Sequence, residues 1–131
     1  MALQGLVRDY MIEDVFTVKP EDNVQKAIET IVKGIDQLPV IDDKRQLVGM
    51  ITWRDISEKV ILKDQIPNEV KVKEVMETKI ITLSPRDPVR KALGLLTVRK
   101  FSLPVVENRK LIGLLSFMDV LKSYLDAVST H

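Results

Sequence analysis

An internal repeat of about sixty residues limits the fold of this 131-residue chain more than any other feature of its sequence. Four pairs of segments match in the same order, three at an offset of 65 residues and the last at 64: VRDYM (7–11) with VKEVM (72–76), TVKPEDNV (17–24) with TLSPRDPV (82–89), QLPVI (37–41) with SLPVV (102–106), and GMITWRD (49–55) with GLLSFMD (113–119). Solenoid repeats are shorter than this unit. The two copies therefore predict a pair related by a pseudo-twofold axis.

Each copy has the pattern of the element order β-α-β-β-α, so the predicted fold class is α+β, with two repeats packed about that axis. In each copy a short helical or irregular lead, which ends near Met11 or Met76, precedes a β-rich run, at 15–18 or 80–83, and a proline follows each run. The predicted divisions of the chain are a first repeat with an N-terminal lead (1–63), a connector (64–71) and a second repeat with a C-terminal tail (72–131).

The first helix of each copy has a recognisable start. Asp22 and Gln25 have the spacing of a capping box in the first copy, and Asp87 precedes Pro88 as an N-cap in the second. A hairpin and a final helix follow in each copy, the final helices being expected at about 54–63 and 118–127.

Each hairpin has a proline in its first strand. Pro39 and Pro104 have no N–H to donate to a ladder. We therefore expect these strands to begin, or to lie at a sheet edge, at the proline.

Composition excludes several classes of function. Lysine and arginine (20) nearly balance aspartate and glutamate (19), and the net charge of +1 predicts no strong attraction to nucleic acid or to anionic membranes. There is no cysteine for a disulfide or a thiolate metal site, and no apolar run reaches the roughly 20 residues of a membrane span. The sequence therefore predicts a soluble, cytoplasmic protein without a metal site.

The segments GMITWRD and GLLSFMD each end a hydrophobic run with a hydroxyl and place an aspartate three residues later. Thr52 with Asp55, and Ser116 with Asp119, match a capping box at a helix start. A helix start directly after a strand is also a place where backbone N–H groups hold a phosphate or a sugar hydroxyl. The two interpretations are compatible, and both stay open.

The repeated order V-x-D/E-x-M, T-V/L-x-P, helix, L-P-V and G-h-h-S/T-x-x-D, where h is hydrophobic, closely resembles a pair of CBS domains, a Bateman module. The resemblance covers about 7–63 and 72–127, nearly the whole chain. It implies two copies packed sheet to sheet as a stand-alone pair that forms a homodimer. It also implies regulated binding of AMP, ADP, ATP or S-adenosylmethionine in the clefts between the copies, with the ribose on the aspartate.

The resemblance implies two nucleotide sites, each combining residues of both copies. Site A would contain Thr52, Arg54, Asp55, Ile80, Arg99, Lys100, Phe101, Ser102 and Pro104. Site B would contain Val15, Ile35, Asp36, Gln37, Pro39, Ser116 and Asp119.

The two predicted sites differ in charge. Arg54, Arg99 and Lys100 would favour a phosphate at site A, although Arg99 and Lys100 also fit ordinary cation placement near a helix C-terminus. Asp36 would repel a phosphate at site B unless it points to solvent. We therefore expect the nucleotide at site A, and at site B a less anionic ligand or none.

Two other features have simple interpretations. Trp53 fits packing at a helix start or a subunit contact better than stacking on adenine. The pair Asp42 and Asp43 fits a solvated hairpin turn better than a metal site.

Three functional hypotheses follow. The first is a ligand-sensing regulatory module that transmits its occupancy to a regulated protein of unknown identity, and the second is an interaction scaffold of the same fold without a small ligand. The third, an enzyme, is opposed by the absence of cysteine, of internal histidine, of a Gly-x-Ser-x-Gly elbow and of a phosphate-binding Gly-x-x-x-x-Gly-Lys loop. We therefore expect no enzyme and no catalytic cofactor.

Overall fold

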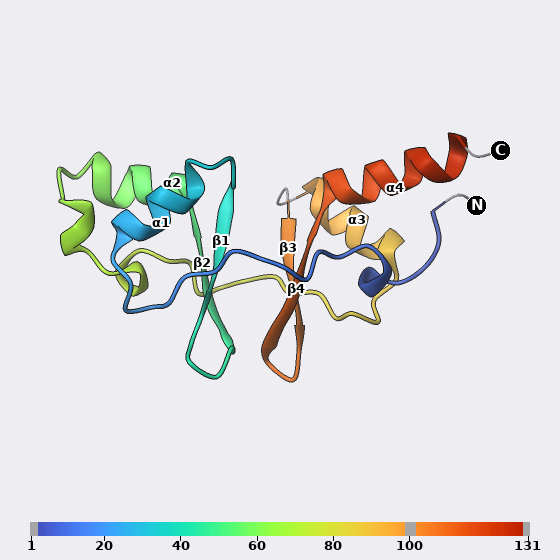
Figure 1. The fold of residues 1–131 in the computed structure, drawn as a ribbon, viewed down its shortest axis with the longest axis horizontal. Helices are drawn as coiled ribbons and strands as arrows, with labels where there is room; N and C mark the ends of the chain where they lie inside the picture. The colour runs from blue at the N-terminus through green and yellow to red at the C-terminus, as the bar shows by residue number, and fades with distance from the viewer. Residues whose placement is uncertain (1–2, 99–101, 130–131) are drawn as a thin grey trace. The chain divides into compact units, whose positions relative to one another are not determined.

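The structure is a computed structural model that describes residues 3–98 and 102–129. The chain forms two compact units, which are drawn in Figure 1. The central unit is Phe16–Ile80. The terminal unit combines the described residues up to Val15 with those from Ile81 onward.

The central unit contains helix α1 (Val24–Ile31) and an antiparallel pair of strands, β1 (Gln37–Ile41) and β2 (Leu47–Thr52). Helix α2 (Trp53–Ile56) follows β2 directly and continues as the π-helical turn η2 (Ser57–Ile61). Two short 3-10 turns, η3 (Pro67–Glu69) and η4 (Val72–Glu74), complete the unit. Its core is made of buried aliphatic side chains, among them Val24, Ala27, Leu38, Ile51, Val60 and Val72.

The terminal unit has the same plan. It contains the 3-10 turn η1 (Val7–Asp9), helix α3 (Val89–Val98), the antiparallel strands β3 (Ser102–Glu107) and β4 (Lys110–Ser116), and helix α4 (Phe117–Ser129). Its core again consists of aliphatic side chains, among them Val7, Val89, Ala92, Leu103, Leu115 and Val120. Mixed helix and strand content, two small antiparallel sheets and two repeats confirm the predicted α+β fold class.

The lead segments are the parts of the chain before the two β-rich runs, residues 3–14 and 72–79. Each compact unit contains the lead segment of the other repeat. In the terminal unit the N–H of Val7 donates to the carbonyl of Asp87 (2.8 Å), and Figure 1 shows the blue segment around η1 beside α3. In the central unit the N–H of Val72 donates to the carbonyl of Asp22 (2.8 Å). The lead segment of the first repeat therefore packs in the unit that contains the second hairpin. The lead segment of the second repeat packs in the unit that contains the first hairpin. The compact units thus differ from the sequence repeats.

The lead segments pair with the second strand of each hairpin. Met50 and Glu77 exchange two backbone hydrogen bonds of 2.9 and 2.8 Å, and Ile12 and Leu114 exchange two of 2.9 Å. Met50 and Leu114 lie opposite Pro39 and Pro104 in the two hairpins. The backbone N–H and C=O groups of Met50 and Leu114 therefore point toward the lead segments and away from the prolines. Because the facing residue needs no hydrogen bond from Pro39 or Pro104, the missing N–H of the proline does not weaken the hairpin.

The β-rich runs at 15–18 and 80–83 form single bridges, not strands. Val18 bridges Val40 in parallel, and Leu83 bridges Val105 in parallel. The predicted order of elements therefore holds, with the first β element of each copy reduced to one bridge.

The two predicted helix starts need correction. The N-cap of α1 is Asn23, whose side chain accepts from the N–H of Lys26 (3.0 Å). Asp22 instead accepts from the N–H of Lys19 (2.8 Å), and Asp87 accepts from the N–H of Ser84 (2.9 Å). The aspartate of each Pro-x-Asp segment therefore closes the turn around the proline, and α3 begins at Val89.

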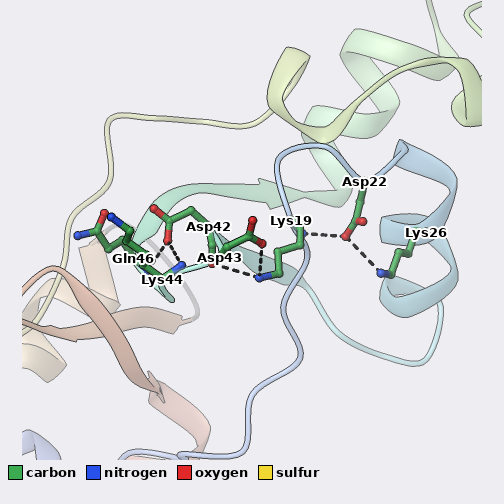
Figure 2. A network of polar contacts seen from close by, with 7 residues as sticks. All are labelled: Lys19, Asp22, Lys26, Asp42, Asp43, Lys44 and Gln46. Atoms are coloured by element: carbon green, nitrogen blue, oxygen red, sulfur yellow. Dashed lines mark hydrogen bonds and ion pairs between the residues drawn. The ribbon is translucent and has the colours of Figure 1, made fainter.

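Figure 2 shows the polar contacts around the hairpin turn of the central unit. Asp42 Oδ1 accepts from the N–H groups of Lys44 (2.9 Å) and Gln46 (2.8 Å), while Lys19 Nζ contacts the Asp42 carbonyl (3.1 Å) and Asp43 Oδ1 (3.3 Å). Within the described residues, no group of three or more His, Cys, Asp or Glu side chains is placed to hold a metal. The contacts of Asp42 are those of a turn-forming residue.

Candidate functional site

The junction between β2 and α2 contains a complete capping box. Thr52 Oγ1 accepts from the N–H of Asp55 (3.1 Å), and Asp55 Oδ2 accepts from the N–H (3.0 Å) and the hydroxyl (2.9 Å) of Thr52. The junction between β4 and α4 has the same arrangement of hydroxyl and carboxylate. Ser116 Oγ accepts from the N–H of Asp119 (3.1 Å) and donates to Asp119 Oδ2 (2.6 Å). The capping interpretation of both segments is therefore confirmed.

The Asp55 carboxylate has a further partner that the sequence analysis missed. Lys59 Nζ lies 3.1 Å from Asp55 Oδ1 and 3.1 Å from Glu77 Oε1, and it donates to the Val75 carbonyl (2.9 Å). The i,i+4 spacing of Asp55 and Lys59 is a sequence signal that could have found the first contact. Glu77 comes from the lead of the second repeat, so its contact depends on the exchange of leads.

The charges of this cluster are stabilised by its contacts. Burial raises the pKa of the Asp55 carboxyl, but its interaction with Glu77 and the hydrogen bonds from Thr52 and Lys59 lower it, and the net pKa is below the ordinary value. Burial lowers the pKa of Lys59, but the bonds to Glu77 and Asp55 raise it, and the net pKa is above the ordinary value. Both groups are therefore charged at neutral pH.

The residues of predicted sites A and B are distributed over both units. The central unit contains Thr52, Arg54, Asp55 and Ile80 of site A, with Ile35, Asp36, Gln37 and Pro39 of site B. The terminal unit contains Ser102 and Pro104 of site A, with Val15, Ser116 and Asp119 of site B. Arg99, Lys100 and Phe101 lie outside the described residues. The grouping of these residues into two shared sites stays a prediction.

Within each unit, the structure brings together residues from different predicted sites. Gln37 lies opposite Thr52 in the hairpin of the central unit, and Ser102 lies opposite Ser116 in the hairpin of the terminal unit. Gln37 and Ser102 are both 7% exposed. Each hairpin therefore ends in a pair of polar side chains beside the start of a helix.

Three side chains near the central junction are exposed. Asp36 is exposed, as the solvent-pointing alternative requires, and its carbonyl accepts from the N–H of Trp53 (3.4 Å). Trp53 is 53% exposed, and the Arg54 guanidinium lies 5.5 Å from the centre of its ring. Trp53 is therefore not buried within the chain, and its indole face is in contact with a cation.

Comparison with known proteins identifies the family. The model of the CBS domain matches residues 7–61 and 72–126, so the chain belongs to the CBS domain family and carries a tandem pair of these domains. Modules of this family are generally regulatory. In the part of the chain that the structure describes, no helix has the length and apolar character needed to cross a membrane.

Three similar proteins illustrate the range of this family. The homoserine O-acetyltransferase of Methanohalobium evestigatum is 32% identical over 117 residues, which are 87% of this chain and 23% of that protein. A CBS domain-containing protein of unknown function from Bacillus anthracis is 27% identical, with a TM-score of 0.84 and coverage of 95% of this chain and 96% of that one. CBSX2, crystallised in complex with AMP, is 30% identical, with a TM-score of 0.79 and coverage of 92% and 96%. This chain thus spans less than a quarter of the acetyltransferase.

Proposed function

We propose that this CBS pair is a regulatory module that binds an adenosine-containing ligand and transmits its occupancy to a partner protein in the cytoplasm. The observation that carries the proposal is the Ser/Thr-x-x-Asp device at both strand-to-helix junctions, in a chain 30% identical to a protein crystallised with AMP. The candidate ligands are AMP, ADP, ATP and S-adenosylmethionine.

The chemistry of the device suits a ribose. A carboxylate accepts two hydrogen bonds side by side, which matches the two adjacent hydroxyls of the sugar. The helix start provides N–H groups and the positive end of the dipole. Binding between two CBS domains would shift their arrangement by the difference in ligand affinity between the two arrangements, and a partner would respond to that shift.

The module is proposed to act without catalysis. The sequence has no cysteine, no internal histidine and neither of the nucleophile or phosphate-loop motifs sought above. The similarity to the acetyltransferase covers 23% of that enzyme, so its activity is not transferred to this chain. Steady formation of product from a bound nucleotide would overturn this part of the proposal.

A scaffold without a small ligand is the second candidate, and one observation favours it. Hydrogen bonds between Thr52 and Asp55, and between Ser116 and Asp119, complete both junctions in the chain alone. A device that caps a helix has a structural role even when no ligand is bound. The two candidates therefore differ in binding, and not in fold.

We also propose that the module is a homodimer that associates through α4. This helix buries Val120 but exposes Met118, Leu121, Tyr124, Leu125 and Val128. The spacing of these residues places them along one stripe of the helix. A second copy of the same helix, with its own apolar stripe, is the partner that we propose for it.

Calorimetric titration of the nucleotide-free protein with the four ligands tests the proposal. Saturable binding with a preference among them is the expected result. No heat with any of the four, from protein shown to be folded by circular dichroism, would favour the scaffold.

A further inference from the structure

We propose that the ion pair with Lys59 prevents Asp55 from binding a ligand. Asp119 is then the aspartate that accepts hydrogen bonds from the ribose, and each chain binds one nucleotide. The inference rests on the proposed function, and it reverses the preference for site A that the sequence alone predicts. Its basis is the different surroundings of two aspartates that occupy the same position in the repeat.

The Asp55 carboxylate is occupied on both oxygens. Oδ2 accepts two hydrogen bonds from Thr52, and Oδ1 is paired with Lys59 at 3.1 Å, in a residue that is only 5% exposed. A ribose diol would compete with Lys59 for Oδ1. Lys59 is also bound to Glu77 and to the Val75 carbonyl, so its displacement would break three contacts at once.

The second repeat has no lysine at the position of Lys59 and no carboxylate at the position of Glu77. The residue four positions after Asp119 is Ser123, which is exposed and carries no charge. The residue that pairs with β4, as Glu77 pairs with β2, is Ile12. Among the described residues, Asp119 Oδ1 makes no hydrogen bond or ion pair, and Asp119 is half-buried. One carboxylate oxygen is therefore available to a ligand in this repeat.

Net charge does not distinguish the two aspartates for a phosphate-bearing ligand. Two carboxylates share one ammonium around Asp55, and Asp119 is a carboxylate without an ion pair among the described residues, so one negative charge is in excess at each. Asp36, the carboxylate that the sequence analysis placed in site B, is exposed, and solvent screens its charge.

Calorimetry with AMP on the full chain tests this inference through stoichiometry, which a purely structural role of Lys59 would not change. We expect one AMP per chain in the wild type and a loss of at least about tenfold in affinity for Asp119→Ala. Lys59→Ser introduces the residue of the second repeat and should raise the stoichiometry to two. Adding Asp55→Ala to Lys59→Ser should return it to one.

Control variants separate this effect from general loss of a lysine. Lys26→Ser removes another i,i+4 pair of the central unit, with Asp22 at 3.3 Å, and should keep one AMP per chain. Lys59→Arg keeps an ion pair and should also keep one. Lys59→Met, which retains the apolar part of the side chain but no hydrogen-bond donor, serves if the serine variant is unfolded by circular dichroism, and it should also give two.

The outcomes distinguish the inference from the proposed function. Two AMP per chain in the wild type, or full binding after Asp119→Ala, would overturn the inference and leave nucleotide binding established. Unchanged stoichiometry in folded Lys59→Ser and Lys59→Met would also overturn it. Absence of binding of AMP, ADP, ATP and S-adenosylmethionine in the wild type and in both Lys59 variants would overturn the proposed function and this inference together.

Discussion

At the scale of single residues, equivalent positions of the repeat have acquired different partners. Asp55 and Asp119 both close a capping box, but only Asp55 is also held by a lysine. A buried carboxylate is costly unless it is paired and hydrogen-bonded, and the contacts of Asp55 satisfy that condition. Both aspartates therefore stabilise a helix start, and they differ in the lysine that pairs with Asp55.

Glu21 gives a pH-dependent prediction. Hydrogen bonds from Lys71 (2.6 Å) and Lys73 (2.7 Å) hold the pKa of this carboxyl at about 2, below its ordinary value of 4.5. A pKa lowered in the folded state contributes stability above pH 4.5, and that contribution is lost as the pH falls toward 2. The unfolding midpoint of the wild type in urea should exceed that of Glu21→Gln at pH 6, and the two should converge on acidification.

The control for this prediction is Glu29→Gln, which removes an exposed carboxylate of the same unit whose hydrogen-bond partner is the uncharged Gln25. A difference between the wild type and Glu21→Gln that stays constant from pH 6 to pH 2 would contradict the assigned pairing.

Sequence reasoning at this scale succeeded where the interaction is local. The capping residues Thr52 and Ser116 lie three positions from their aspartates, and a short motif describes such a contact completely. The contact between Lys59 and Glu77 spans 18 positions and depends on where the lead segment lies. Asn23 was missed as the N-cap because Asp22, one residue earlier, has equal capping propensity.

At the scale of elements, a glycine in each hairpin permits the lead segment to approach. A Cβ at Gly49 would lie 2.5 Å from Met76 Sδ and 3.0 Å from the Glu77 carbonyl. A Cβ at Gly113 would lie 2.9 Å from the Ile12 carbonyl and 2.9 Å from Met11 Sδ. The repeated G-h-h-S/T-x-x-D motif therefore begins with a packing requirement that is separate from the helix start.

Substitution of these glycines should loosen the leads. Gly113→Ala places a methyl group against the backbone of Ile12, and we expect it to lower the free energy of unfolding by about 1–3 kcal/mol, as overpacking does. Gly49→Ala should act in the same direction. Urea unfolding followed by circular dichroism measures both.

The matched control is Gly94→Ala within α3, where no atom of the described residues, apart from the neighbouring residues and the backbone of the helix itself, lies within 4 Å of the added Cβ. This change should stabilise the protein by up to about 1 kcal/mol through helix propensity. Equal effects at Gly94 and Gly113 would show that the lead does not pack closely on β4.

The sequence predicted the elements better than their partners. The hairpins and the final helices were expected near their observed places, because proline, turn and periodicity signals are local. The exchange of leads was not expected, because VRDYM and VKEVM fit either hairpin equally well in a repeated sequence. The runs at 15–18 and 80–83 were taken for strands because β-branched residues favour extended backbone, although each makes only one bridge.

At the scale of the whole molecule, α4 carries the most extensive exposed apolar stripe of a helix in the described chain. Leu125 is 63% exposed and Met118 is 50% exposed, whereas Val120 is fully buried in the core. Periodicity predicted an apolar helix there but could not assign its faces, because both the core and a second subunit select aliphatic residues.

The dimer proposal gives a prediction on assembly. Leu125→Glu places a charge on the stripe and should convert a dimer to a monomer, as measured by light scattering after size-exclusion chromatography. Asp126→Lys, a charge change at the next residue and outside the stripe, should remain a dimer. A monomeric wild type, or a dimeric Leu125→Glu, would contradict the role of α4.

The exchange of leads also sets an order of events during synthesis on the ribosome. The central unit is one continuous segment, Phe16–Ile80, and it is complete before the second hairpin has been made. The terminal unit includes residues that are made before the central unit, yet the partner of Ile12 is Leu114, which is made after it. Because synthesis proceeds at a limited rate, the segment around Ile12 can take its place only after the whole central unit has been made.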